Sequence, residues 1–348
     1  MKSSLLLVVL AAMGCSDPNS AGASAGAGGA AGAATSSSSA VTSAGGNGSG
    51  GAAAGVLELG ITVHLENHAP YDQTYLDRLR AYGNLFKDHG AKLTLEPRQE
   101  MWTAVKGANA ALFSDLEAQG HSFGVHAALG SVDSYQQFVN TLTALRKELA
   151  GKDITVEQVS GQCQNFDWVT GSVEAGYVAM TGGTENCLLA LAPENRPAGY
   201  ENLNCPKATD CHDVYPQETE KKLHPWRAKD GSDWLTDNPD GKLVILPSNG
   251  TLPCLEEEAE SPGMLTSCTF TQADIDLSKE QIDAALAVID PSKINQLYFV
   301  WSFGLELSDE LLETWFAMLE PYIADGRIVW KTQEEVYADY LAWEATNR

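Results

Sequence analysis

The chain has 348 residues, of which 44% are hydrophobic, and its 46 acidic side chains outnumber 22 basic ones to give a formal net charge of −24. This length is sufficient for one large domain with a sizeable core. The negative charge argues against nucleic acid and anionic lipid surfaces as partners, because both repel an acidic protein.

The first fifteen residues have the pattern of an export signal. Met1 and Lys2 precede an apolar run from Leu5 to Met13, which is too short to span a bilayer. The run leads into Ala-Met-Gly-Cys at positions 12–15, which resembles a bacterial lipobox with Cys15 as the acylated residue. An ordinary cleaved signal peptide is the alternative. We therefore predict an exported protein, anchored by lipid at Cys15 on the periplasmic side or the cell surface, with the outer membrane as the expected location.

Residues 16–55 are almost entirely Ala, Gly and Ser. A segment of this composition has little apolar surface to bury and cannot offset the entropy lost on ordering. It predicts a disordered tether that separates the anchor from a folded domain over residues 56–348.

Short apolar runs alternate with amphipathic stretches along the folded domain, and Gly, Pro or Asn bound many of them. The predicted strands are Leu59–Glu66, Ala91–Glu96, Ser122–Ala127, Ile154–Val159, Tyr177–Thr181, Lys242–Pro247, Gln296–Trp301 and Arg327–Lys331. The predicted helices are Asp72–Asp88, Glu100–Ala118, Val132–Ala150, Val169–Ala175, Ser278–Val288, Ser308–Ala324 and Gln333–Trp343, with Ser278 and Ser308 as N-caps.

This alternation predicts an α/β fold with a parallel sheet and helical crossovers. Seven or eight such units favour a distorted (β/α)7-8 barrel over an open sheet, although periodicity alone does not establish closure. The stretch from Ala192 to Leu277 interrupts the rhythm and holds four cysteines. We interpret it as a disulfide-rich loop insertion on the face where strands end and substrates bind.

Six cysteines follow Cys15, an even number that in an exported protein indicates disulfides. Fifteen connectivities are possible. Local spacing suggests the pairs Cys205–Cys211 and Cys254–Cys268, which leaves Cys163 with Cys187. A zinc site is the competing interpretation, but the chain has no Cys-x-x-Cys pair.

Histidines and a carboxylate gather where the first predicted strand ends, in the segment His64-Leu-Glu66-Asn-His68. Imidazole and carboxylate at one strand end suit a divalent metal, with zinc the natural candidate. Alternatively, His64 is a hydrogen-bonded core residue and His68 is simply exposed.

A second histidine motif, Gly120-His121-Ser-Phe-Gly-Val-His126, opens and ends the third predicted strand. It resembles the second motif of the polysaccharide deacetylase superfamily, in which a Gly-His pair opens a strand that ends in a His-x-x-x-His metal pair. The resemblance implies a deacetylase-like barrel, with His126 as a metal ligand, Glu66 at the metal-binding Asp of the first motif, and His121 in a structural role.

The chain departs from that family at three positions. Gly130 stands where the second histidine ligand belongs, Leu65 replaces the aspartate base, and Trp301 to Phe303 replace the catalytic histidine of the last motif. We therefore predict a metal held by Glu66, His126 and His68 (or His64), with Asp167 or Glu66 as the catalytic carboxylate. Loss of catalysis is the alternative that these departures raise.

His64 to Tyr71 also resembles the opening of glycoside hydrolase family fifty-seven, which makes a glycosidase the weaker alternative. Aromatic side chains near strand ends can stack on sugar rings, although each of them is equally compatible with a place in the core. The predicted substrate-binding residues are His64, Trp168, Trp226, Arg227, Trp234 and Trp301. These features together predict hydrolysis of acyl groups on a polysaccharide or oligosaccharide, with a catalytically silent carbohydrate-binding or envelope protein as the alternative.

Overall fold

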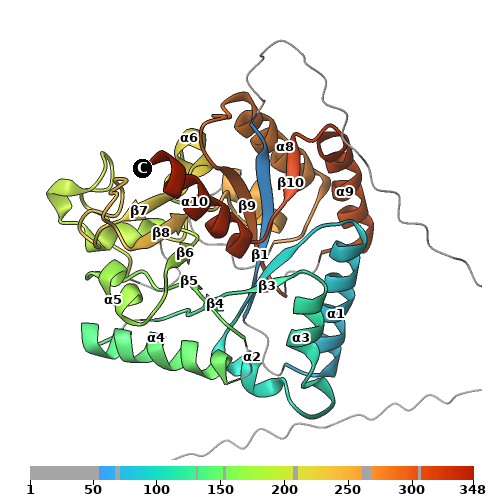
Figure 1. Ribbon diagram of the computed structural model, residues 1–348, viewed down its shortest axis with the longest axis horizontal. Helices are drawn as coiled ribbons and strands as arrows, with labels where there is room; N and C mark the ends of the chain where they lie inside the picture. The colour runs from blue at the N-terminus through green and yellow to red at the C-terminus, as the bar shows by residue number, and fades with distance from the viewer. Residues whose placement is uncertain are drawn as a thin grey trace, which may run out of the picture. The chain divides into compact units, whose positions relative to one another are not determined.

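A computed structural model of the protein describes residues 55–66, 71–130, 132–151, 154–206, 211–260, 268–304 and 307–348. Strands and helices alternate through the first half of this domain, as the sequence predicts (Figure 1). In chain order they are β1 (Leu57–Leu65), α1 (Gln73–Asp88), β2 (Leu93–Pro97), α2 (Gln99–Ala104), α3 (Leu112–Ala118), β3 (Ser122–Phe123), β4 (Val125–His126), α4 (Tyr135–Ala150), β5 (Gln158–Ser160), α5 (Trp168–Glu174) and β6 (Ala179–Thr181).

The second half begins with the region predicted as an insertion and then returns to regular alternation. Its elements are α6 (Thr219–Leu223), β7 (Trp226–Ala228), β8 (Leu243–Leu246), α7 (Leu255–Glu260), α8 (Gln272–Ala287), β9 (Asn295–Ser302), α9 (Asp309–Ala324), β10 (Ile328–Trp330) and α10 (Gln333–Asn347). Every helix in these described ranges is too short or too polar to cross a bilayer.

The strands form a closed, distorted parallel barrel. β1 pairs with β9 on one edge and with β2 and β10 on the other, while β4, β5, β6 and β8 continue the parallel order in a second sheet. Gly124 alone separates β3 from β4, so one chain segment joins the two sheets. The remaining gap closes where the Asn249 amide donates to the Tyr298 carbonyl and the Val300 amide donates to Gly250. The predicted barrel is therefore confirmed.

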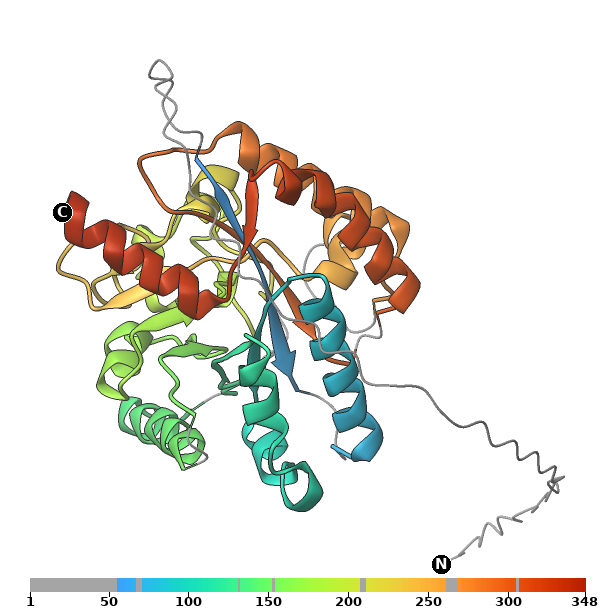
Figure 2. The same ribbon diagram turned by 45° about the vertical axis from the view of Figure 1, so that its right-hand side comes forward.

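Alternate residues of β1 have different surroundings, because successive side chains of a strand point to opposite faces. Leu57 and Leu59 belong to the apolar core, together with residues of the outer helices. In α1 and α9, which lie on the same side of β1 in Figure 2, Phe86 packs edge-to-face on Phe316. The alternate positions of the strands are instead buried and polar, and Thr62, Thr94, Glu96, Ser160 and Thr181 are among them.

The C-terminal helix α10 packs at the end of the barrel where the strands begin. Its Val336 and Tyr340 form a small apolar cluster with Ala179, the first residue of β6, and with Tyr298. The amide of Gln333 donates to Thr94 of β2. This packing leaves the carboxyl ends of the strands as the open face of the barrel.

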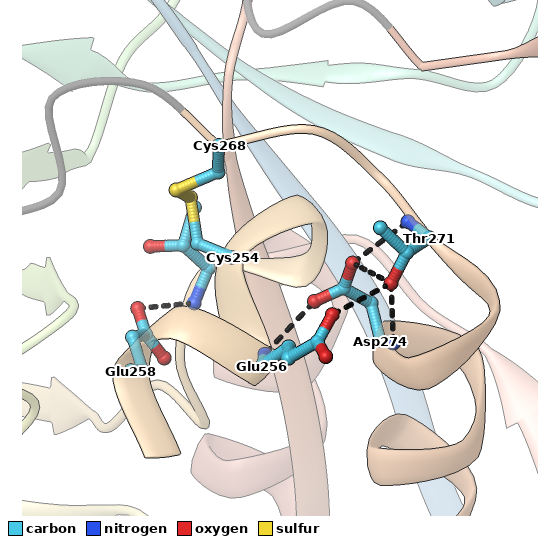
Figure 3. The surroundings of a disulfide bond; sticks show 7 residues. Cys254, Glu256, Glu258, Cys268, Thr271 and Asp274 are labelled. Atoms are coloured by element: carbon cyan, nitrogen blue, oxygen red, sulfur yellow. Dashed lines mark hydrogen bonds between the residues drawn. A yellow bond between two sulfur atoms is a disulfide. The ribbon is translucent and has the colours of Figure 1, made fainter. Parts of the chain in front are cut away.

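Three disulfides join the expected pairs: Cys205–Cys211 and Cys254–Cys268, which local spacing suggests, and Cys163–Cys187, the pair that remains. The last of these lies beside the start of α7, where carboxylates make a dense set of hydrogen bonds (Figure 3). Asp274 accepts from the amides of Thr271 and Glu256, and Glu258 accepts from the amide of Thr251. These contacts support the turn that follows β8 and closes the barrel.

Two predicted helices differ from the structure. The predicted helix Glu100–Ala118 is interrupted between α2 and α3, where Val105 is extended and Gly107 has a φ of +59°. Helix α8 begins before the predicted cap Ser278, because Thr271 and Asp274 form a capping box at its true start. Ser278 is instead buried inside the helix, and its hydroxyl donates to the Ile275 carbonyl.

Candidate metal centre

Several strand ends deliver polar side chains to one point at the open face of the barrel. His64 lies at the end of β1 with Glu66 just beyond it, and His126 is the last residue of β4. Ser160 ends β5 and Ser302 ends β9. The carboxyl ends of parallel strands in a barrel meet on one face, so residues far apart in the sequence come together here.

His64, Glu66 and His126 form the core of this group. Each offers one ligand atom, and these three atoms lie within 4.8 Å of one another. Nε2 of His126 lies 3.1 Å from Oε2 of Glu66, and Nδ1 of His64 lies 4.0 Å from Oε1 of Glu66. The side chains keep 16%, 15% and 11% of their surface exposed, in the order His64, Glu66, His126, so the cluster is partly exposed at the surface.

Glu96 of β2 lies beneath the cluster and is completely buried. Its Oε2 lies 3.2 Å from Nε2 of His64 and accepts a short hydrogen bond from the Ser160 hydroxyl. Its Oε1 accepts a short hydrogen bond from Thr181 of β6. The sequence assigned Glu96 only to a strand. The signal that could have found it is a carboxylate between Leu95 and Pro97, at the end of a strand that is otherwise buried.

Hydroxyl groups and glycines complete the surroundings. Ser160 lies 2.8 Å from Nδ1 of His126, and Ser302 donates to Oε1 of Glu66 over 3.1 Å. A side chain at Gly161 would place its Cβ 3.0 Å from Cε1 of His126, so this position leaves room for the imidazole. Ser302 stands in the last-motif segment where the deacetylase resemblance implies a catalytic histidine.

The charges of the cluster shift its pKa values in opposite directions. Burial disfavours charge on His64, but its hydrogen bond to Glu96 and the charges of Glu96 and Glu66 raise its pKa above the usual histidine value. Burial and the neighbouring His64 lower the pKa of His126. Burial opposes ionisation of Glu66, yet the adjacent imidazole of His126, with a smaller effect of His64, holds the pKa of Glu66 well below its usual range. Glu66 is therefore ionised at neutral pH and is a weak base.

No protein-family model and no curated protein sequence matches the chain. Solved structures do match its fold. Puue allantoinase superposes with a TM-score of 0.50 at 11% identity, over 84% of this chain and 91% of that one. A protein assigned as a polysaccharide deacetylase from Mycobacterium smegmatis superposes with a TM-score of 0.50 at 12% identity, over 83% and 91%.

The chain therefore shares the barrel fold of these two proteins. At these identities the likeness concerns the fold alone, and the chemistry has to be argued from the residues of this chain. Its two histidine nitrogens and one carboxylate oxygen are the donor set found in catalytic zinc sites. The separation of 3.1 Å between Nε2 of His126 and Oε2 of Glu66 is close to that of two ligands sharing one small ion. The residues present therefore fit a divalent cation.

His121, the histidine that opens the strand motif, is a structural residue. It is buried, its Nδ1 accepts from the Leu93 amide, and its Nε2 lies 3.0 Å from the Gly83 carbonyl. It therefore ties β2 to α1, as the resemblance implies for this position.

Asp167, predicted as a catalytic base, is the N-cap of α5. Its Oδ1 accepts from the amides of Thr170 and Gly231 at 3.0 and 2.7 Å, and its Oδ2 accepts from the Thr170 hydroxyl at 2.6 Å. The structure does not include Asp167 in the His64–Glu66–His126 cluster. Its carboxylate stabilises a helix start and a neighbouring loop.

The four tryptophans predicted to stack on substrate are buried. Trp168 and Trp234 have no exposed surface and pack edge-to-face on each other, and Trp226 donates to the Trp234 carbonyl. Trp301 packs edge-to-face on Tyr82 beneath α1. In this conformation these indoles contribute to the core and offer no open face to a sugar ring.

The remaining predicted site residues lie elsewhere. Arg227 of β7 forms a bidentate ion pair with Glu344 of α10, with its Nε and Nη2 2.7 and 2.6 Å from the carboxylate oxygens. His68, predicted as a metal ligand, and Cys15, predicted as the lipidation site, lie outside the described residues. The structure brings Glu66 and His126 together as expected, with His64 as the third member of the group.

Proposed function

We propose that the protein is a metal-dependent hydrolase that removes acyl groups from a polysaccharide or oligosaccharide. The convergence of His64, Glu66 and His126 at the open face of a deacetylase-type barrel carries this proposal. These three residues would hold the cation, and zinc suits their nitrogen and oxygen atoms. When bound, such a cation supplies polarisation of an acyl carbonyl and activation of water.

The residues around the ligands would each do one task in that reaction. Ser302 orients the Glu66 carboxylate by donating to Oε1, which leaves Oε2 toward His126. Ser160 holds the His126 ring through Nδ1.

A catalytically silent carbohydrate-binding or envelope protein is the second candidate. It is supported by the engagement of Asp167 in a helix cap and by the full burial of Glu96. Glu66 is held ionised by its histidine neighbours, which makes it a better ligand than a general base. A cation bound without hydrolysis would fit this arrangement.

Metal content and acetate release separate these candidates. The purified full-length protein should retain near-stoichiometric zinc or another divalent ion after dialysis, and should release acetate from acetylated chitooligosaccharides, peptidoglycan or xylan. Metal without acetate supports the silent protein. A new reducing end without acetate supports a glycosidase. Absence of bound metal, even after incubation with zinc, together with absence of acetate contradicts the hydrolase.

We further propose that the protein is exported and anchored by lipid at Cys15. The three disulfides support an oxidising compartment, because such bonds are rare in the reducing cytosol. Replacement C15S should abolish incorporation of labelled fatty acid and shift the protein from the membrane fraction to the soluble one. Unchanged labelling and partitioning in this variant contradict the anchor.

A further inference from the structure

Three polar groups contact the carboxylate of Glu96, which has no exposed surface. The Ser160 hydroxyl and His64 Nε2 both meet its Oε2, and the Thr181 hydroxyl meets its Oε1. A carboxylate only accepts hydrogen bonds, so each of these groups must donate its hydrogen to Glu96. His64 is therefore protonated at Nε2, which leaves Nδ1 as its bare nitrogen when the ring is neutral.

The hydrogen bond from Ser160 to Glu96 also fixes the tautomer of His126. In the described part of the chain, Glu96 itself forms no hydrogen bond with His126. A serine hydroxyl has one hydrogen, and Ser160 gives it to Glu96. Only the lone pairs of Ser160 then remain for His126, whose Nδ1 lies 2.8 Å away and must donate. The bare nitrogen of a neutral His126 is consequently Nε2.

These two bare nitrogens are the ones that face Glu66. His126 Nε2 lies 3.1 Å from Oε2, and His64 Nδ1 lies 4.0 Å from Oε1. Both bare nitrogens thus lie beside the Glu66 carboxylate, and their lone pairs are repelled by its oxygens unless a cation or a proton lies between them. The opposite tautomer of His126 would direct an N–H at Glu66 and form an ordinary hydrogen bond instead.

We propose that Glu96 is a positioning residue that fixes the tautomers of both histidines, directly at His64 and through Ser160 at His126, so that both present a bare nitrogen to a divalent cation. The fold reserves a place for this carboxylate, because a Cβ at Gly124 would lie 3.0 Å from both Cγ and Oε1 of Glu96. Carboxylates and hydroxyls behind metal-binding histidines raise ligand basicity and set ring orientation in this manner. The inference builds on the cation site of the proposed function.

The deciding experiment reads the ring nitrogens by ¹⁵N NMR in the full-length protein freed of metal, at an alkaline pH where the imidazoles are neutral. The wild-type protein should carry the proton on Nε2 of His64 and on Nδ1 of His126. In Glu96→Leu, Ser160 is released to donate to Nδ1 of His126, and His126 should change to the Nε2–H form. A purely structural role for Glu96 predicts no such change in a ring that it does not touch.

Cation affinity gives the second readout. Glu96→Leu should bind zinc about 10- to 100-fold more weakly than wild type, the usual effect of losing such a partner. The matched control is Thr62→Val, which changes a buried hydroxyl of β1 that has no hydrogen-bond partner among the described residues. This control should keep both tautomers and bind zinc within about twofold of wild type, a change of about 0.4 kcal/mol at 1.4 kcal/mol per tenfold.

Two outcomes overturn the inference: an unchanged His126 tautomer in Glu96→Leu, or a wild-type His126 that is bare at Nδ1. If Glu96→Leu does not fold, Ser160→Ala gives the same decision, since it should change His126 to the Nε2–H form and leave His64 protonated at Nε2. The tautomers are measured without metal, so they test the role of Glu96 whether or not the protein binds a cation. A protein that binds no cation contradicts the proposed function alone.

Discussion

The imidazole rings of His64 and His126 stack on each other, with ring centroids 4.0 Å apart and an angle of 20° between their planes. The two histidines come from β1 and β4, which pair with different neighbours in the barrel. Charge on one ring disfavours charge on the other at this distance. The stack therefore suits two neutral rings beside one anionic Glu66 better than two imidazolium ions.

Glu66 should be essential for cation binding. Glu66→Gln keeps the size of the side chain but removes the negative charge between the two histidines, so zinc affinity measured by calorimetry should fall at least about tenfold. The matched control is Glu313→Gln on α9, an exposed carboxylate paired with His89 on the surface, which should bind zinc like wild type. Equal affinity in Glu66→Gln would show that the cation, if any, binds elsewhere.

Asp167 should matter for stability rather than for catalysis. Its carboxylate caps α5 and holds the Gly231 amide, so Asp167→Ala should lower the free energy of unfolding by about 1–2 kcal/mol in urea denaturation. Asp167→Asn should retain most of that stability, because asparagine is an equally good N-cap. If Asp167 were instead a general base, Asp167→Asn would keep the same stability but lower acetate release at least about 100-fold.

The sequence predicts the succession of strands and helices because buried strands and amphipathic helices leave direct patterns in the hydrophobic residues. The sequence predicts the start of a helix less well where a second capping residue lies nearby. Ser278 resembles an N-cap, yet Thr271 with Asp274 makes the stronger capping box about two helical turns earlier. Gly107, at a positive φ between α2 and α3, marks an interruption that the apolar spacing across it conceals.

The candidate site is predictable only in part for a similar reason. Glu66 and His126 are visible because they follow strands, and such positions meet on one face of a barrel. Glu96 and Ser160 become meaningful only once the strand register shows that they point into the same polar interior. Trp168 and Trp234 could not be distinguished from ligand-stacking residues, because the aromatic cluster that buries them forms between α5 and a distant loop.

Glu58 should make the protein less stable as the pH rises. Burial and the charges of Asp339 and Glu335, opposed by Lys331, raise its pKa to about 8 from a usual value near 4.5. The folded protein therefore binds one more proton than the unfolded chain between these values. The free energy of unfolding contributed by this group falls with increasing pH across that window, by up to about 1.4 kcal/mol per pH unit, and is constant above it.

The variant Glu58→Gln isolates this effect. When its stability is compared with that of wild type at each pH, the contributions of the other titrating groups cancel. The variant should gain stability relative to wild type between pH 5 and about 8 in chemical denaturation, and the difference should then level off. A difference that is independent of pH over this range would mean that Glu58 titrates normally in the folded protein.

The three disulfides should contribute unequally to the free energy of unfolding, and the disulfide that closes the longest loop should contribute the most. Their sequence separations are 24 for Cys163–Cys187, 14 for Cys254–Cys268 and 6 for Cys205–Cys211. Loop-closure entropy then predicts losses of about 3.5, 3 and 2 kcal/mol in the paired Cys→Ala variants, measured by urea denaturation. The reverse order would indicate that native contacts around each bond outweigh its effect on the unfolded chain.

Gly124 should be intolerant of even one methyl group. It lies between β3 and β4, and a Cβ there would approach both Cγ and Oε1 of the buried Glu96 at 3.0 Å. The carboxylate cannot move away freely, because Thr181 and Ser160 bind its two oxygens. Gly124→Ala should therefore cost about 1–3 kcal/mol of stability, as overpacking of a core does, and should weaken zinc binding by displacing the partner of His64.

Gly130 provides the matched control at the same face of the barrel. A Cβ at this position would meet no atom of the described residues within 4 Å, and Gly130 is not among the described glycines with a positive φ. Gly130→Ala should therefore leave the urea midpoint and the zinc affinity close to those of wild type. If Gly124→Ala behaves like Gly130→Ala in both measurements, Glu96 has room to move and cannot set the geometry of His64. If Gly124→Ala loses stability but binds zinc normally, the contact between Gly124 and Glu96 matters for packing alone.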